Sequence, residues 1–253
     1  MENNIGDRFQ QATKYTRENA AFMRTASDPA GRPPISKKYP DSARITLPPP
    51  QTGKLLSLDQ ALHQRKSIRQ YTNRPMTVER LSYLIWATTG IQRTEGEFRF
   101  RPAPSAGRTY PIETYLAVNN ITGIPQGLYH YAIVAHALET LKEGDFSRDV
   151  KRAAMGQKIC AEAPVVFIWT AIFQRVKYRY HEHSYRYIYL DAGHLAQNFA
   201  LTATAMGLAT CQIGAFYDDE VNGIIGVDGT EESIVYMSVA GTIRHKVRHR
   251  ENI

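Results

Sequence analysis

A basic run between residues 65 and 69 carries the most specific chemistry in this 253-residue chain. Arg65, Lys66 and Arg69 supply three cations, and Ser67 supplies a hydroxyl among them. Guanidinium groups form paired hydrogen bonds with phosphate oxygens, and a neighbouring serine adds a neutral hydrogen bond. The run therefore favours a site for a phosphorylated ligand. The structural alternative is a solvated helix end, where the cations complement the helix dipole.

Two segments of small residues could let a flat ligand approach the backbone closely. Proline and glycine fix a turn, and small side chains leave the backbone amides open. An ordinary turn is the structural alternative for each segment. The segments are Pro104, Ser105, Ala106 and Gly107, and then Ile213, Gly214 and Ala215.

Other chemistry is weaker in this sequence. His181, His183, Asp191 and His194 are residue types that bind zinc or iron, but their spacing matches no strong metal motif. Tyrosines and arginines alternate over residues 175–187, which is typical of a stacking surface for single-stranded nucleic acid. No nucleic-acid module, dinucleotide fingerprint or P-loop is present in the sequence. We therefore predict neither a metal nor a nucleic-acid partner.

The composition bounds the class of protein. The chain is 43% hydrophobic and 22% charged, with a net charge of +7, and its lysines and arginines are interrupted by acids. Such a balance favours binding of small anions over binding of a polymer. No apolar stretch suits a signal peptide or a membrane span, so we expect a cytoplasmic protein. Cys160 and Cys211 have no partner motif, which predicts reduced, buried thiols.

The chain divides into an arm and a body. Residues 1–55 lack sustained apolar periodicity and contain Pro48, Pro49 and Pro50. Proline favours extended backbone over helix, so we expect an extended proline-rich arm that lies on the body or on a partner subunit. Residues 56–253 are expected to form the globular domain.

Helix and strand signals alternate along this body. Ser57, Thr77 and Asp218 are candidate N-caps of three helices, and Gly90 is the candidate terminator of the second. A fourth helix is expected over residues 191–208, with small residues that permit close packing across a dimer interface. Strands are expected at 113–118, 127–131, 133–141, 164–169 and 233–240, with a hairpin between the second and third. Interleaving of this kind predicts a mixed-sheet sandwich of helices and strands.

Taken in order, these segments resemble the nitroreductase superfamily, and in particular its SagB-type branch, which includes thiazoline and oxazoline dehydrogenases. The resemblance extends over roughly residues 57 to 245, and a set of ordered motifs is more specific than any single one. The matching segments are 65–71, 84–91, 104–107 with 110–113, 127–131, 191–198, 213–216 and 226–229.

The resemblance implies an α+β fold: a three-layer α/β/α sandwich with a mixed, mainly antiparallel sheet, in an intertwined homodimer. FMN would bind at the subunit interface, with segment 104–107 supplied by the partner subunit. Arg65 and Ser67, beside Lys66, would hold the FMN phosphate, and Arg69 would face the pyrimidine edge. Within segment 213–215, Gly214 and Ala215 would offer amides near the reactive N5. Lys246 and Arg248 are further candidates for the phosphate.

The resemblance also implies a reaction. NAD(P)H would pass hydride through N5 to a small organic acceptor, such as a quinone or nitroaromatic, in a ping-pong mechanism without a catalytic side chain. One alternative is oxidation of thiazoline or oxazoline rings in a peptide, and another is a flavin-binding redox sensor without turnover. Flavin fragmentation and reductive dehalogenation occur on similar folds. Arg108 stands where this branch often has a small residue, so an anionic substrate is a further hypothesis.

Overall fold

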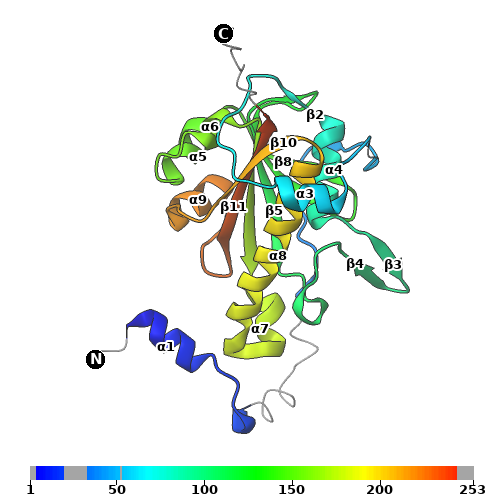
Figure 1. Cartoon of the computed structure of the whole chain (residues 1–253). Helices are drawn as coiled ribbons and strands as arrows, with labels where there is room; N and C mark the ends of the chain where they lie inside the picture. The colour runs from blue at the N-terminus through cyan, green and yellow to red at the C-terminus, as the bar shows by residue number, and fades with distance from the viewer. Residues whose placement is uncertain (1–3, 20–32, 52, 244–253) are drawn as a thin grey trace, which may run out of the picture.

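A seven-stranded sheet runs through the centre of the chain, for which the computed structural model describes residues 4–19, 33–51 and 53–243 (Figure 1). The strand order is β1-β8-β7-β5-β9-β11-β10, and every neighbouring pair is antiparallel. The strands are β1 (Arg44–Thr46), β5 (Ile112–Val118), β7 (Gly127–Ala132), β8 (Ala137–Glu143), β9 (Val165–Ile172), β10 (Leu208–Ile213) and β11 (Glu232–Thr242).

One face of the sheet is covered by α4 (Val78–Thr89) and the long helix α8 (Ser184–Ala205), with α3 (Leu58–Gln64) packed on α8. Phe199 of α8 lies edge-on to Phe167 and Trp169 of β9, with ring centroids 4.7 and 5.6 Å away. These three rings are fully buried. Burying an aromatic side chain stabilises the fold by about 1.5–3 kcal/mol, so this contact fixes α8 on the sheet.

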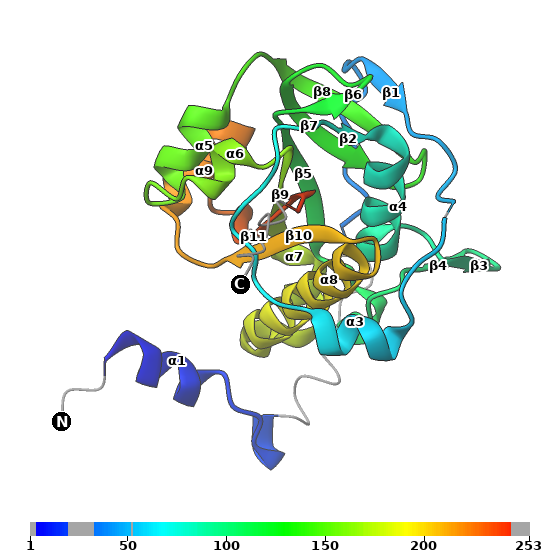
Figure 2. The same ribbon diagram turned by 45° about the horizontal axis from the view of Figure 1, so that its top comes forward.

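The opposite face carries α5 (Ser147–Ala153), α6 (Ile159–Glu162) and α9 (Asp218–Ile225). Figure 2 shows the sheet between these helices and the group α3, α4 and α8. The central strand β9 therefore has apolar neighbours on both sides, as the apolar run at 164–169 predicts. Cys160 and Cys211 are free thiols in this second core, and burial raises the pKa of Cys160 to about 12. The prediction of buried, unpaired thiols is confirmed.

Two of the predicted helix starts are confirmed by their caps. Ser57 and Gln60 form a capping box at the start of α3, and Thr77 accepts from the Arg80 amide at the start of α4. Gly90 ends α4 without a left-handed conformation. Glycine is required there for space, because a Cβ would lie 2.5 Å from Cδ1 of Trp86. At α9 the predicted cap was wrong: the helix begins at Asp218, and its side chain makes no capping hydrogen bond.

Shorter elements complete the described part of the chain. They are α1 (Ile5–Ala12), β2 (Met76–Thr77), β3 (Arg93–Glu95), β4 (Phe98–Phe100), η2 (Ala106–Arg108), β6 (Ile121–Thr122), α7 (Gln174–Tyr180) and η3 (His181–His183). The β3–β4 hairpin projects beside α4 in Figure 1, and β2 and β6 form a small parallel pair outside the main sheet.

The first 55 residues differ from a fully extended arm. Residues 5–12 are helical, because Asn4 accepts from the Asp7 amide and caps α1. Residues 44–46 form β1 and pair with β8, so this stretch is an edge strand of the main sheet. Residues 17–19 are also helical, and residues 33–43 are extended or turn-like and lie against the body.

Several boundaries also differ from the expectations. α8 starts at Ser184, seven residues before the predicted start, and the chain turns into β10 at Leu208. The strand expected at 133 begins at Ala137, because residues 133–136 form the hairpin turn. The strand β10 itself was missed. The predicted class, an α+β sandwich with a mainly antiparallel sheet, is confirmed.

Candidate functional site

The basic run 65–69 lies in extended backbone directly after α3 and is fixed to the sheet. The Ile68 amide donates to the Thr210 carbonyl of β10 at 2.8 Å. Tyr71 is buried and its hydroxyl donates to the Ile68 carbonyl at 2.9 Å. Its ring packs where Gly241 of β11 has no side chain, since a Cβ there would lie 2.5 Å from Cδ1 of Tyr71. These contacts hold the run in place from both sides.

The side chains of the run remain open. Lys66, Ser67 and Arg69 are exposed, and Arg65 is half-buried. Among the described residues, none of these four side chains has a hydrogen-bond or ion-pair partner. A fixed backbone with several unpaired cations suits a phosphate, which would be bound by charge-assisted hydrogen bonds. The residues present therefore fit the phosphate of the expected cofactor.

The second predicted segment, 213–215, follows β10 at the same edge of the sheet. Gly214 and Ala215 are exposed, and a Cβ added at Gly214 would meet only the Tyr236 ring, at 3.8 Å. The backbone here is thus accessible to a flat ligand. Ile213 is buried in the second core, so its side chain has a packing role.

Thr210 links these two segments and was not singled out from the sequence. It accepts from Ile68 through its carbonyl and stands three residues before Ile213 on β10. Its hydroxyl is buried and has no hydrogen-bond partner in the described structure. A buried hydroxyl of this kind normally bonds to protein, water or ligand. No sequence signal distinguishes Thr210 from other strand threonines.

The third segment, 104–107, is held by α8. The Ser105 hydroxyl donates to Asp191 at 2.5 Å and accepts from the Tyr110 amide at 2.9 Å. The Ala106 amide also donates to Asp191. Burial raises the pKa of Asp191, and the hydrogen bonds from Ser105 and Ala106 oppose that shift. Asp191 therefore positions segment 104–107, in which Pro104 and Gly107 are exposed. The sequence around Asp191 did not indicate this positioning role.

The basic run and segment 104–107 attach to different parts of the chain. Segment 104–107 is bound at Asp191, whereas the residues just before α3 meet α8 where the Leu56 amide donates to the Ala205 carbonyl. Fourteen residues separate Asp191 from Ala205, which is about 21 Å along a helix. α3 and α7 accordingly lie beside different ends of α8 in Figure 1.

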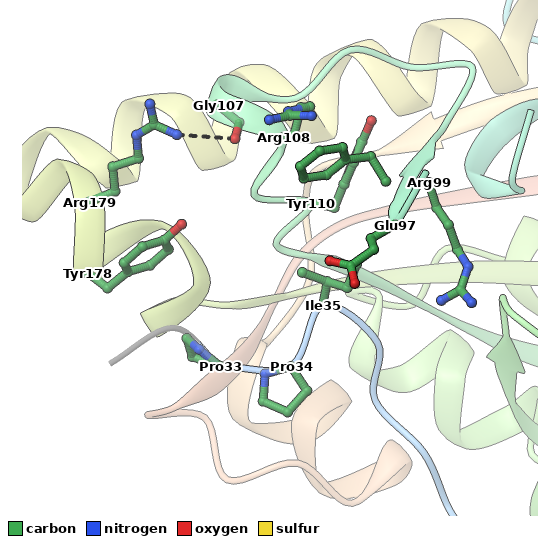
Figure 3. Close-up of a pocket in the computed structure, with 11 residues that line it drawn as sticks. Pro33, Pro34, Ile35, Glu97, Arg99, Gly107, Arg108, Tyr110, Tyr178 and Arg179 are labelled. Atoms are coloured by element: carbon green, nitrogen blue, oxygen red, sulfur yellow. Dashed lines mark hydrogen bonds between the residues drawn. The ribbon is translucent and has the colours of Figure 1, made fainter. Parts of the chain in front are cut away.

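Arg108 lines a cavity of about 340 Å³ beside Gly107. Its guanidinium lies 4.1 Å from the ring centroid of Phe98 in the same chain. Figure 3 shows Arg108 and Arg179 near Gly107, whose carbonyl accepts from Arg179 at 3.4 Å.

The histidine-rich strip between α7 and α8 packs on the N-terminal segment. His183 stacks on Tyr15 with ring centroids 3.8 Å apart, and its Nδ1 lies 2.7 Å from the Thr13 carbonyl. Over residues 4–19, 33–51 and 53–243, no three His, Cys, Asp or Glu side chains are grouped as metal ligands. In the same residues, no helix has the length and hydropathy needed to cross a membrane. Lys246 and Arg248 lie outside the described residues.

The fold and these segments define a class: an antiparallel α+β sandwich with a basic loop fixed against an edge strand. The nitroreductase family model matches residues 62–242, and the chain belongs to this family. A nitroreductase-named protein of Methanocaldococcus jannaschii, MJ1384, is 34% identical over 187 residues, which are 74% of this chain and 91% of that protein.

Two further proteins are similar to the chain. The trifolitoxin-processing protein TfxB of Rhizobium leguminosarum bv. trifolii is 31% identical over 159 residues, 61% of this chain and 42% of TfxB. A nitroreductase-named structure from Anabaena variabilis has a TM-score of 0.73 at 24% identity, covering 94% of this chain and 47% of that one. The chain thus spans less than half of each of these two proteins. The relatives agree with the SagB-type branch.

Proposed function

We propose that this chain is an FMN-dependent oxidoreductase that transfers hydride from NAD(P)H to an organic acceptor such as a quinone or a nitroaromatic. One observation carries the proposal. A basic run with no side-chain partners among the described residues is fixed by a backbone hydrogen bond from Ile68 to β10, the strand that leads into the open segment 213–215. Membership of the nitroreductase family supports an oxidoreductase.

Bound FMN would supply the hydride chemistry, at its N5, and the chain's own residues would bind and orient it. Arg65 and Ser67 would hold the phosphate through charge-assisted and neutral hydrogen bonds. Arg69 would place positive charge beside the pyrimidine edge, where a reduced ring gains electron density. The amides of Gly214 and Ala215 would face the reactive side of the ring. No side chain acts as an acid, base or nucleophile in this proposal.

The proposed site is shared between two copies of the chain. The distance of about 21 Å along α8 between the anchor of segment 104–107 and the end next to α3 supports this arrangement. Two copies of α8 packed antiparallel would bring each Asp191 end beside the partner's Ala205 end. Tyr189 and Leu190 on α8 are more than half exposed and would be covered in such a dimer.

The first test is the cofactor and the oligomeric state of the purified protein. We expect about one noncovalent FMN per subunit, steady NADH or NADPH oxidation with a quinone, and a dimer by light scattering. FAD as the released cofactor, or a protein that ignores added FMN, would contradict the cofactor. A monomer that still reduced a quinone would contradict the shared site. FMN binding without turnover would favour the redox-sensor alternative.

A second candidate function is dehydrogenation of thiazoline or oxazoline rings in a peptide. The similarity to TfxB, whose name describes it as trifolitoxin-processing, favours this candidate. The two functions differ in the direction of electron flow: a peptide oxidase would reduce its flavin with an azoline peptide in the absence of NAD(P)H. Anaerobic bleaching of the flavin absorbance by each donor in turn separates them.

A further inference from the structure

A cavity of about 340 Å³ lies between the β3–β4 hairpin, the η2 turn, α7 and the segment at residues 33–35. It is outside the basic run 65–69, but it borders Gly107 and so adjoins segment 104–107. Its walls combine aromatic rings, among them Phe98, Tyr110 and Tyr178, with three arginines and one glutamate. A cavity of this composition can hold a planar ring and a negative charge together.

The three arginines, Arg99, Arg108 and Arg179, are exposed, and no carboxylate of the described residues lies within ion-pair distance of them. Arg108 stacks on Phe98, and Arg179 donates only to the Gly107 carbonyl, at a long 3.4 Å. Glu97 is the one acid on the cavity wall, so the formal charge of the lining is positive. In Figure 3 the Glu97 carboxylate points toward Ile35, away from Gly107 and its two neighbouring arginines.

The backbone beside the cavity is held in an uncommon conformation. Gly107, Arg108 and Tyr110 have φ angles of 57°, 59° and 46°. Left-handed backbone is unfavourable for residues with a side chain and concentrates at functional sites. A Cβ on Gly107 would lie 2.3 Å from the Tyr180 hydroxyl and 2.9 Å from Nη1 of Arg179. The turn therefore sets the direction of the Arg108 side chain. The missing side chain at Gly107 leaves space for Arg179 beside it.

From these observations we infer that the cavity binds the carboxylate of an aromatic acceptor, with Arg108 and Arg179 as its partners at the Gly107 end. Guanidinium groups bind carboxylates through two parallel hydrogen bonds, and the neighbouring rings give the acceptor an apolar surface. The inference rests on the proposed function, because segment 104–107 is the part of this chain expected to face the partner subunit's flavin. It names the substrate class: anionic aromatic compounds.

The test uses FMN-loaded full-length protein and two acceptors with the same reducible group, 4-nitrobenzoate and 4-nitrobenzamide. The measured quantity is the ratio of kcat/KM for the anion to kcat/KM for the amide. Comparing this ratio between variants cancels the difference in intrinsic reactivity. Arg108→Gln and Arg179→Gln should each lower the ratio roughly tenfold, as expected for the loss of a charged hydrogen-bond partner. Glu97→Gln should raise it, because it removes the repelling charge.

Arg93→Gln is the matched control. Arg93 is on the same hairpin, but its Nε pairs with Glu95 at 2.6 Å and its side chain does not line the cavity. The ratio should not change in this variant. A drop equal to that of Arg108→Gln would show a general effect of surface charge and would overturn the inference.

Binding of benzoate, which carries no reducible nitro group, is measured by calorimetry on the same proteins. We expect weaker binding in Arg108→Gln and tighter binding in Glu97→Gln. Turnover of the amide with an unchanged ratio in both arginine variants would overturn the inference and leave the proposed function standing. If neither these acceptors nor a quinone is reduced, the proposed function fails, and the benzoate titration still decides whether the cavity binds an aromatic carboxylate.

Discussion

Charged side chains gather in two regions of this molecule, and the two regions differ in whether those side chains are paired. The basic run 65–69 has cations without side-chain partners in the described structure, mostly at the surface. The other region, here called the buried ionic cluster, lies on the α5, α6 and α9 face of the sheet, and its carboxylates all have partners. Its members are Lys37, Arg44, Glu113, His130, Glu139, Arg175 and Glu232.

Glu113 shows how complete the pairing is. One carboxylate oxygen lies 2.6 Å from Nη1 of Arg175 and accepts from the Lys37 amide at 3.0 Å. The other lies 3.1 Å from Nε2 of His130, and the second ring nitrogen of His130 lies 2.9 Å from Glu139. The exposed fractions of the Glu113, His130 and Glu139 side chains are 3%, 0% and 0%.

Two cluster members come from the N-terminal segment and attach it to the sheet. Lys37 lies 2.6 Å from Glu232 of β11, and Arg44 of β1 lies 2.8 Å from Glu139 of β8. The hydroxyls of Tyr115 and Thr170 donate to the other Glu232 carboxylate oxygen, at 2.7 and 2.6 Å. Lys37 and Arg44 precede residues 62–242, the region that matches the family model. The N-terminal segment therefore completes the ionic cluster on this face of the sheet.

The difference between the regions follows from solvation. A buried charge loses its water and is tolerated only when protein groups replace it, so the three buried carboxylates are all paired, although the Arg44 side chain is 47% exposed. An exposed cation stays hydrated, so it needs no protein partner and remains available to bind a ligand. Pairing thus indicates structural charges, and unpaired cations on a fixed backbone indicate a binding site. Four predictions test this difference between the two regions.

The largest effect is expected from Glu113→Gln. This change keeps the size of the side chain but leaves Arg175, which is 2% exposed, without a counter-charge. Removing one member of a buried pair costs about 3–5 kcal/mol of unfolding free energy, measurable by chemical denaturation. The exposed pair Arg93–Glu95 is the control, and Glu95→Gln should cost less than about 1 kcal/mol. Equal effects of the two variants would refute a distinct role for burial.

The next effect is the pH dependence of that same contribution. Burial alone raises the pKa of Glu113, but the hydrogen bond from His130 and the charges of Arg175 and Arg101 outweigh it and lower the pKa to about 2. Because this is below the ordinary value of 4.5, the stabilisation is complete above pH 4.5 and is lost as the pH falls toward 2. Its size is on the order of 3 kcal/mol. Acid denaturation of wild type and Glu113→Gln should converge over this window; parallel curves would contradict it.

Arg65→Ala should act on ligand affinity and leave the fold almost intact. Losing a charge-assisted contact weakens FMN binding by about 1.5–3 kcal/mol, a rise in Kd of roughly ten- to 150-fold. Unfolding free energy of the apoprotein should change by less than about 1 kcal/mol. Arg65→Lys should restore part of the affinity, because lysine lacks the planar fork. Flavin fluorescence titration measures the Kd, and an unchanged value would remove Arg65 from the site.

Ser67→Ala should give the smallest effect. A neutral hydroxyl contributes about 1 kcal/mol, so the Kd for FMN should rise about fivefold. The stability of the apoprotein should not change, because the exposed Ser67 side chain has no hydrogen-bond partner among the described residues. Loss of stability without loss of FMN affinity would show that the run is structural, like the buried ionic cluster.

Local signals predicted much of the secondary structure and the open side chains of the site. The capping residues Ser57 and Thr77 predicted two helices, and the apolar run at 164–169 predicted the central strand. The basic run could be found because its residue types carry the chemistry, whatever they pack against. The start of α8 could not be found, because the aromatic and charged residues at 184–190 bury only part of their surface against α7 and the N-terminal segment.

Residue type and local spacing are enough to locate charge and small residues along the chain. Which charges are paired depends on the tertiary structure. Lys37 and Glu232 are 195 residues apart, and Arg175 and Glu113 lie on different elements, so no periodicity relates them. The sheet brings them to one face and removes their water, and burial then makes pairing obligatory. The run at 65–69 differs because β10 and the Tyr71 hydroxyl hold its backbone while its side chains stay largely in solvent.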